Sequence, residues 1–92
     1  MTNFVPCRAR ALRLRYGISL AELAGAMGVS VQLVNRIELE QERQTPAHEQ
    51  ALRRAFAVII DRRRAQLDAL EWELAGCGGL FQTINGDDEH GI

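Results

Sequence analysis

The apolar positions near the start of this chain recur at intervals of three and four residues, the spacing of one face of an α-helix. Ala9, Leu12 and Tyr16 form the first such stripe, and Gly17 follows it as a C-terminal cap. Pro6 suits the first helical position, where the missing N–H is not needed. The pattern therefore predicts a first helix that runs from Pro6 to about Tyr16.

A second, short helix is predicted from its end signals. Ser19 and Glu22 have the spacing of a capping box, so the helix opens near Leu20. Gly28 ends it about two turns later. The residues expected to point inward are Leu23, Ala24 and Met27.

A third helix follows at once, because Ser30 is placed to cap a segment from Val31 to Leu39. Val34 and Ile37 stand three residues apart and are expected to be buried. The wholly polar stretch 40–44 then predicts a solvated helix end and a loop. Two helices joined by a sharp turn thus fill residues 20–39.

The fourth helix is predicted to be much longer than the others. Thr45 is a good N-cap and Pro46 a good first residue, and no Gly or Pro follows until Gly76. A break within residues 61–64 is an alternative to one continuous helix. One stripe runs along it, formed by Leu52, Phe56, Ile59, Arg63, Leu67, Leu70 and Leu74. Its second half has no remaining chain to cover it and needs a partner surface.

The composition favours a helical fold but does not decide whether the chain binds nucleic acid. Only 5% of residues are aromatic while 47% are hydrophobic, so Leu, Ile, Val and Ala must build the core. The net charge of -1 is unfavourable for a nucleic-acid partner. However, Asp87, Asp88 and Glu89 lie in the last six residues, and without them 11 arginines face 9 acidic side chains.

The same inventory disfavours several other classes of protein. Cys7 and Cys77 form no C-x-x-C pair, and His48 and His90 form no plausible metal or catalytic pair, so we expect no metal, no cofactor and no enzyme. No stretch approaches the length of a membrane span, and the N-terminus lacks an apolar signal region. A soluble, cytoplasmic protein is expected.

Residues 8–56 resemble the lambda-repressor-like, Cro/C1-type family of helix-turn-helix domains, also called the XRE family. The matching string is RALRLRYGISLAELAGAMGVSVQLVNRIE, residues 10–38. Ala24 stands where two crossing helices need a small side chain, Gly28 stands at the turn, and Val34 and Ile37 occupy the buried positions of the recognition helix. The resemblance implies an all-α, four- to five-helix domain that binds double-stranded DNA.

The resemblance also implies the residues that contact DNA. Helix 31–39 would enter the major groove and present Val31, Gln32, Asn35 and Arg36 to base edges. Phosphate contacts would come from helix N-termini and flanking arginines, namely Ser19, Ser30, Arg15 and Arg43. Solvent exposure alone, or pairing of Arg43 with Glu40 or Glu42, is the alternative reading of these polar residues.

Members of this family often link the first and third helices by a partly buried ion pair, which Arg13 and Glu38 are placed to form here. Leu20 replaces the Gln that often opens the second helix, which removes one phosphate contact. Glu40 replaces the usual Gly after the recognition helix, so that helix is allowed to run longer. Acidic residues at 38, 40 and 42 repel phosphate unless they point away from it.

The resulting organisation is a helix-turn-helix domain over residues 1–60, a helical extension over 61–76 and a flexible acidic tail over 77–92. We expect a homodimeric, sequence-specific transcriptional regulator, most simply a repressor. Its dimer surface is expected to consist of Phe56, Ile59, Leu67, Leu70 and Leu74. The alternative is a helical adaptor that binds a partner protein through the C-terminal helix without binding DNA.

Overall fold

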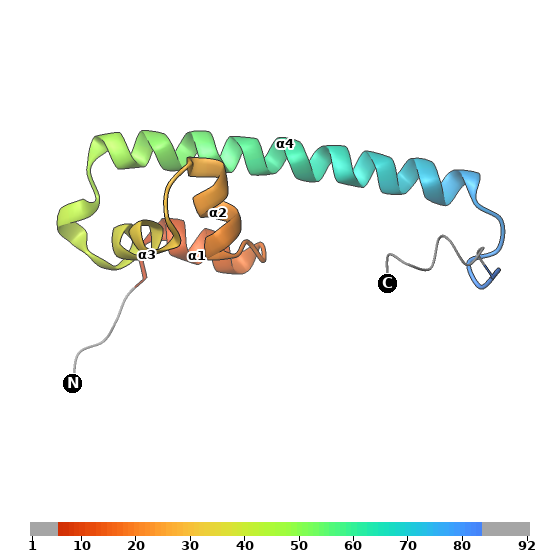
Figure 1. The fold of residues 1–92 in the computed structure, drawn as a ribbon, viewed down its shortest axis with the longest axis horizontal. Coiled ribbons are helices and arrows are strands. Elements are labelled where there is room, and N and C mark those ends of the chain that lie inside the picture. Colours follow the sequence, from red (N-terminus) through yellow and green to blue (C-terminus); the bar gives the residue numbers. More distant parts are fainter. Residues whose placement is uncertain (1–5, 84–92) are drawn as a thin grey trace.

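The computed structural model describes residues 6–83, and this part of the chain consists of helices, turns and loops without a strand. Its elements, in chain order, are α1 (Arg8–Arg15), α2 (Leu20–Met27), α3 (Val31–Leu39), the 3-10 turn η1 (Gln41–Arg43) and α4 (Pro46–Gly76). The first three helices cluster beside the first half of α4, which continues far beyond them (Figure 1). The expected all-α fold with an extended C-terminal helix is confirmed.

Helix α1 differs in part from its prediction. It begins at Arg8 with Cys7 as its N-cap, so Pro6 precedes the helix, and Tyr16 is its C-cap residue. Gly17 follows with a φ of +64°, which is the left-handed conformation expected of a terminating glycine. The apolar stripe is present but stays outside the core, because Leu12 and Tyr16 are exposed. The buried side chain of α1 is a charged one, Arg13.

The caps of α2, α3 and α4 form where the sequence places them. The hydroxyls of Ser19, Ser30 and Thr45 accept hydrogen bonds from Glu22 N, Leu33 N and His48 N at 2.9, 3.1 and 3.2 Å. Each bond satisfies an amide that has no partner inside its own helix. The return half of the capping box differs, since the Glu22 carboxylate accepts a bond from Arg63 instead of turning back to Ser19.

Helix α4 runs unbroken from Pro46 to Gly76, so residues 61–64 contain no break. Its 31 residues give a length of about 46 Å at ~1.5 Å per residue. The third helix ends at Leu39, and the chain passes through η1 rather than extending α3.

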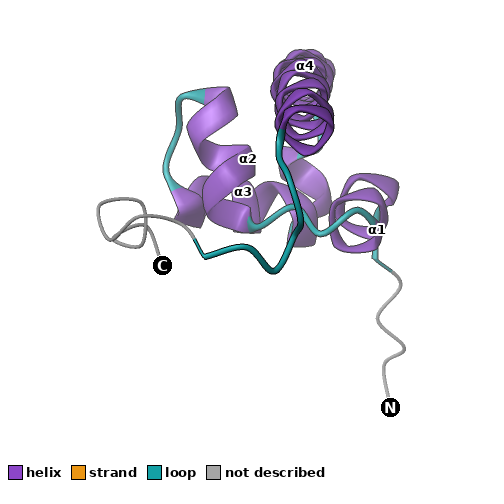
Figure 2. Ribbon diagram, turned by 90° about the vertical axis from the view of Figure 1, so that its right-hand side faces the viewer, coloured by secondary structure: helices purple, strands orange, loops and turns teal. Residues whose placement is uncertain are grey.

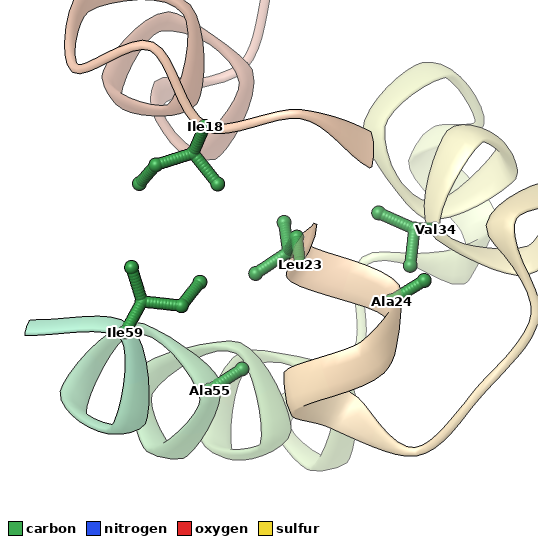
Figure 3. Packing of buried hydrophobic residues seen from close by; sticks show 6 residues of the cluster. All are labelled: Ile18, Leu23, Ala24, Val34, Ala55 and Ile59. Carbon is green, nitrogen blue, oxygen red and sulfur yellow. The ribbon is translucent and has the colours of Figure 1, made fainter. Parts of the chain in front are cut away.

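The core lies between α2, α3 and the first half of α4 (Figure 3). Leu23 and Val34 are completely buried, and burial of each such side chain contributes about 1.5–3 kcal/mol. The full cluster is Ile18, Leu23, Ala24, Val34, Ala55 and Ile59. This core fixes α2 and α3 against each other and against α4, and so sets the orientation of the outer face of α3.

Candidate nucleic-acid interface

The α2–turn–α3 unit has the geometry that a short helix crossing requires. Ala24, only 3% exposed, packs in the same cluster as Val34, where its small side chain lets the two helices approach. Gly28 caps α2 with a φ of +74° and reverses the chain into Val29 and Ser30. Since L residues with a Cβ rarely adopt that φ, glycine is well suited to the turn.

The outer face of α3 is accessible along its length. Val31 is 40% exposed, Gln32 and Arg36 are exposed, and Asn35 is half-buried. Val31 lies four residues before Asn35, and Gln32 lies four before Arg36, so the four side chains lie on one side of the helix. The opposite side carries the buried Val34 and Ile37. The structure therefore brings together the four side chains predicted to contact bases, of which three are exposed and Asn35 is half-buried.

Ser19 and Ser30 lie at the exposed N-termini of α2 and α3. Each hydroxyl oxygen already accepts a backbone N–H, but its own proton remains available for donation. A helix N-terminus also carries partial positive charge, which favours a phosphate oxygen nearby. Both serines can thus cap their helices and still donate to an anion.

The arginines predicted to clamp phosphates lie in different settings. Arg15 is exposed at the last position of α1. Arg43 lies in η1, and its Nε atom is 2.7 Å from Oε1 of Glu40. Arg36 Nε is 3.9 Å from the other oxygen of the same carboxylate. Glu40 is therefore flanked by two positive charges, which offsets its repulsion of phosphate.

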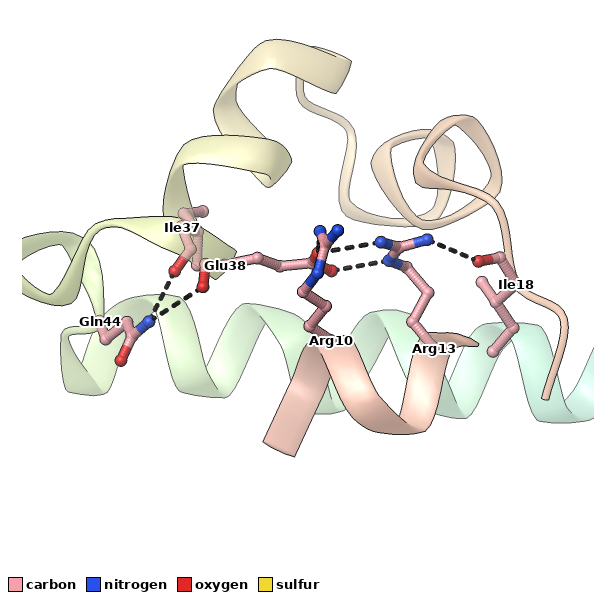
Figure 4. Close-up of polar contacts among 6 residues, drawn as sticks. All are labelled: Arg10, Arg13, Ile18, Ile37, Glu38 and Gln44. Carbon is pink, nitrogen blue, oxygen red and sulfur yellow. Dashed lines mark hydrogen bonds and ion pairs between the residues drawn. The ribbon is translucent and has the colours of Figure 1, made fainter. Parts of the chain in front are cut away.

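Glu38 does not face the outer surface of α3 at all. It is 2% exposed and accepts two hydrogen bonds from Arg13, from Nε at 2.7 Å and from Nη2 at 3.0 Å (Figure 4). Arg10 Nη1 adds a third contact at 3.1 Å. Arg13 Nη1 also donates to the carbonyl of Ile18 at 3.0 Å. The ion pair expected between the first and third helices is present, and it points Glu38 into the protein.

Three polar residues that support this interface were not predicted for these roles. Arg10 shares Glu38 with Arg13, and its spacing of three residues from Arg13 was a usable signal. Gln44 donates from Nε2 to the carbonyl of Ile37 at 3.0 Å, at the C-terminus of α3. Arg63 donates to the carbonyls of Tyr16 and Gly17 at 2.7 and 3.2 Å and ties α4 to the α1–α2 turn. The last two contacts depend on chain packing and leave no local sequence signal.

The residues predicted to form a dimer surface divide into two groups. Ile59 is 1% exposed and belongs to the core, so it is removed from that surface because its side chain faces inward. Phe56 is half-buried against the same core. Leu67, Leu70 and Leu74 are all exposed on the part of α4 beyond the domain.

Within residues 6–83, no group of three or more His, Cys, Asp or Glu side chains is placed to hold a metal ion. No helix in the same range is long and apolar enough to cross a membrane. The two cysteines are unpaired thiols, Cys7 half-buried and Cys77 exposed. The acidic residues at 87–89 lie outside the described residues.

A family model described as helix-turn-helix matches residues 10–58, more than half of the chain, and this match includes all of α2 and α3. No curated protein and no solved structure matches the chain. The match covers the capped helices, the turn glycine and the accessible α3 face described above. The chain therefore belongs to the XRE, or lambda-repressor-like, family of helix-turn-helix proteins, whose domain is a DNA-binding regulatory one.

Proposed function

We propose that this protein is a sequence-specific transcriptional regulator, a cytoplasmic homodimer that represses transcription by occupying DNA. The observation that supports this most strongly is the accessible face of α3, which carries Val31, Gln32, Asn35 and Arg36 above a buried inner face. The family match supplies the DNA-binding class, and the side chains supply the means of reading sequence.

The chemistry of the α3 face suits the major groove. Gln32 and Asn35 can each pair with the donor and acceptor edge of adenine, and Arg36 with the two acceptors of guanine. Val31 can contact the methyl group of thymine. Ser19 and Ser30, together with Arg15 and Arg43, would hold phosphates and fix the register of the helix without reading bases.

A two-fold dimer gives the proposed regulator its operator geometry. Two copies of α3 related by a two-fold axis would read a palindrome whose half-sites lie about 34–36 Å apart, one turn of DNA. Residues 6–83 form no separate region beyond the helices described above. Repression by steric occupancy needs no such region, since bound protein itself blocks the promoter.

Selection from a random library of DNA duplexes, using the full chain, tests this proposal. We expect a palindromic sequence to be enriched, and its affinity to fall steeply as salt concentration rises because phosphate contacts release counterions. Arg36→Ala should weaken binding to that duplex about tenfold or more, since a bidentate contact to guanine is worth ~1–3 kcal/mol. Arg54→Ala is the matched control, because Arg54 is also exposed but lies on α4.

Failure to enrich any duplex, or equal affinity of Arg36→Ala and wild-type protein for the enriched duplex, would contradict the proposal. The second candidate function is then a helical adaptor, which the exposed Leu67, Leu70 and Leu74 favour. Deleting residues 66–92 separates the two candidates. A regulator loses dimerisation and much of its DNA affinity, whereas an adaptor loses its protein partner and has no DNA affinity to lose.

A further inference from the structure

An apolar groove of about 980 Å³ runs between α1 and the first half of α4. Leu12 and Tyr16 line its α1 side, and Phe56 and Ile60 line its α4 side. The end-on view shows α1 standing apart from α4 (Figure 2). The α1 stripe is exposed to this groove, because no helix among residues 6–83 covers it.

The second half of α4 carries an exposed apolar stripe that could fill such a groove. Leu67, Leu70 and Leu74 continue the stripe of Phe56 and Ile60, because these positions follow one another at intervals of three, four or seven along an unbroken helix. The stripe therefore begins inside the groove and leaves the domain on the same face of α4. Leu67 itself lines the outer end of the groove. Exposed leucines in a row of this kind mark a site of association.

The groove is long enough to hold the free end of α4. Residues 65–76 extend for about 18 Å at ~1.5 Å per residue. The part of α4 that lines the groove, from His48 to Leu67, extends for about 30 Å on the same measure. The free half of one α4 thus fits within the groove of another copy.

The two halves of α4 also carry opposite charge. Arginines at 53, 54, 62, 63 and 64 lie in the first part of the helix, whereas residues 65–76 contain Asp68, Glu71 and Glu73 and no basic residue. Arg53, Arg63 and Arg64 line the groove, as does Arg8 of α1. The acidic residues of the lining are Glu49, which pairs with Arg53 at 3.0 Å, and the buried Glu38, which pairs with Arg13 at 2.7 Å. An acidic segment is therefore favoured as the occupant of a groove with a largely basic rim.

We propose that the occupant is a second copy of this chain, whose α4 lies antiparallel so that each free half fills the partner's α1–α4 groove. The inference rests on the dimer in the proposed function and specifies its interface. Antiparallel pairing follows from the charges, since a parallel pair would bring acidic half against acidic half. It also buries the apolar groove and the exposed leucine stripe in one symmetric contact, as two-fold dimers do.

The arrangement has a definite register. In an antiparallel pair, residue numbers that lie level with each other add to a constant. A two-fold axis that crosses α4 between Asp61 and Arg62 sets Leu67 of one copy level with Phe56 of the other. The same axis sets Glu71 level with Leu52, one residue from Arg53 and on the same flank of the seam as Arg53. The surface pair between Arg53 and Glu49 is weak enough to yield to this contact.

Two matched pairs of variants test the proposal by multi-angle light scattering and sedimentation equilibrium of the full chain. Leu70→Arg changes the seam, while Trp72→Arg changes a side chain that is 81% exposed but lies ~200° around the helix. Leu12→Arg changes the groove wall, while Leu14→Arg changes an exposed leucine of α1 outside the groove. We expect the wild type to be a dimer, with Leu70→Arg raising the dissociation constant at least about a hundredfold and Trp72→Arg leaving it within about threefold. Leu12→Arg should weaken the dimer and Leu14→Arg should not.

A charge exchange tests the antiparallel register. Arg53→Glu and Glu71→Arg alone should each raise the dimer dissociation constant by about three- to tenfold, and the double variant should recover most of the loss. Helix content by circular dichroism controls for folding, and Leu70 lies outside the domain core, so Leu70→Arg keeps the domain folded.

Several outcomes would overturn the proposal. The first is a wild type that is monomeric at about 100 μM, because that concentration is far above the dissociation constant of a specific dimer. The second is a dimer weakened more by Trp72→Arg than by Leu70→Arg. The third is a double variant that does not recover the lost affinity. A monomer that fills the groove with another protein would also overturn it. None of these outcomes depends on DNA, so a dimer that fails to bind any duplex would instead contradict the proposed function.

Discussion

At the scale of single residues, the least replaceable contact in this domain is the one between Arg13 and Glu38. Both side chains are almost completely buried, and the guanidinium reaches both oxygens of the carboxylate and one backbone carbonyl. Arg13→Ala would leave the buried Glu38 carboxylate paired with the Arg10 side chain alone. We expect it to destabilise the protein by about 3 kcal/mol or more, measured by thermal and urea unfolding.

The control for that change is Arg8→Ala, which removes an exposed arginine from the same helix. Its effect on stability should stay within about 0.5 kcal/mol. Equal melting temperatures of the two variants would show that the pair between α1 and α3 contributes nothing. Glu38→Gln is a useful third variant, because it keeps the shape of the side chain while removing its charge.

At the scale of elements, the two glycines of α2 have opposite roles. Gly28 ends the helix with a positive φ, whereas Gly25 lies inside it with open space where a Cβ would stand. Gly25→Ala should therefore raise the free energy of unfolding by about 0.5–1 kcal/mol, because alanine loses less backbone entropy in a helix. Gly28→Ala should lower it by about 1 kcal/mol through strain at the turn. Urea unfolding of both variants measures the difference, and the same sign for both would contradict this account of the turn.

The ends of the elements were the most predictable part of the fold, because local groups determine them. Ser19, Ser30 and Thr45 each accept an amide three residues ahead, and that chemistry is visible in the sequence. The phase of the α3 face was predictable for the same reason, since Val34 and Ile37 fix its inner side. The start of α1 was predicted two residues too early, at Pro6 rather than Arg8, because Cys7 caps the helix.

Which residues of an apolar stripe enter the core was predictable only in part: the uncovered second half of α4 was expected, but Ile59 was assigned to the dimer surface. Ile59 and Leu67 belong to one helical stripe, yet Ile59 is in the core and Leu67 is exposed, because α2 and α3 reach only the first half of α4. Leu12 and Tyr16 likewise follow a helical spacing without entering the core. Arg63 donates hydrogen bonds to the backbone carbonyls of Tyr16 and Gly17, which lie 47 and 46 residues away in the chain. A contact over such a separation has no sequence signature.

At the scale of the whole molecule, the extended shape predicts a stability that depends on protein concentration. Residues 68–83 add apolar surface without adding to the core of their own chain. If association covers that surface, the melting temperature rises with protein concentration, because only the folded chain dimerises. Differential scanning calorimetry over a hundredfold concentration range measures this. Leu70→Arg should remove the dependence, and a wild-type melting temperature that stays constant would contradict the dimer.

The central claim is that the outer face of α3 reads base sequence, and a specificity profile of Gln32→Ala tests it most directly. Each base pair of the selected duplex is changed in turn, and the affinities of the wild type and the variant are compared. We predict that the variant loses ~1–3 kcal/mol of discrimination at one or two positions per half-site and keeps its affinity for unrelated duplex. The control Gln50→Ala, on exposed α4, should keep the wild-type profile. A Gln32→Ala profile identical to that of the wild type would contradict the claim.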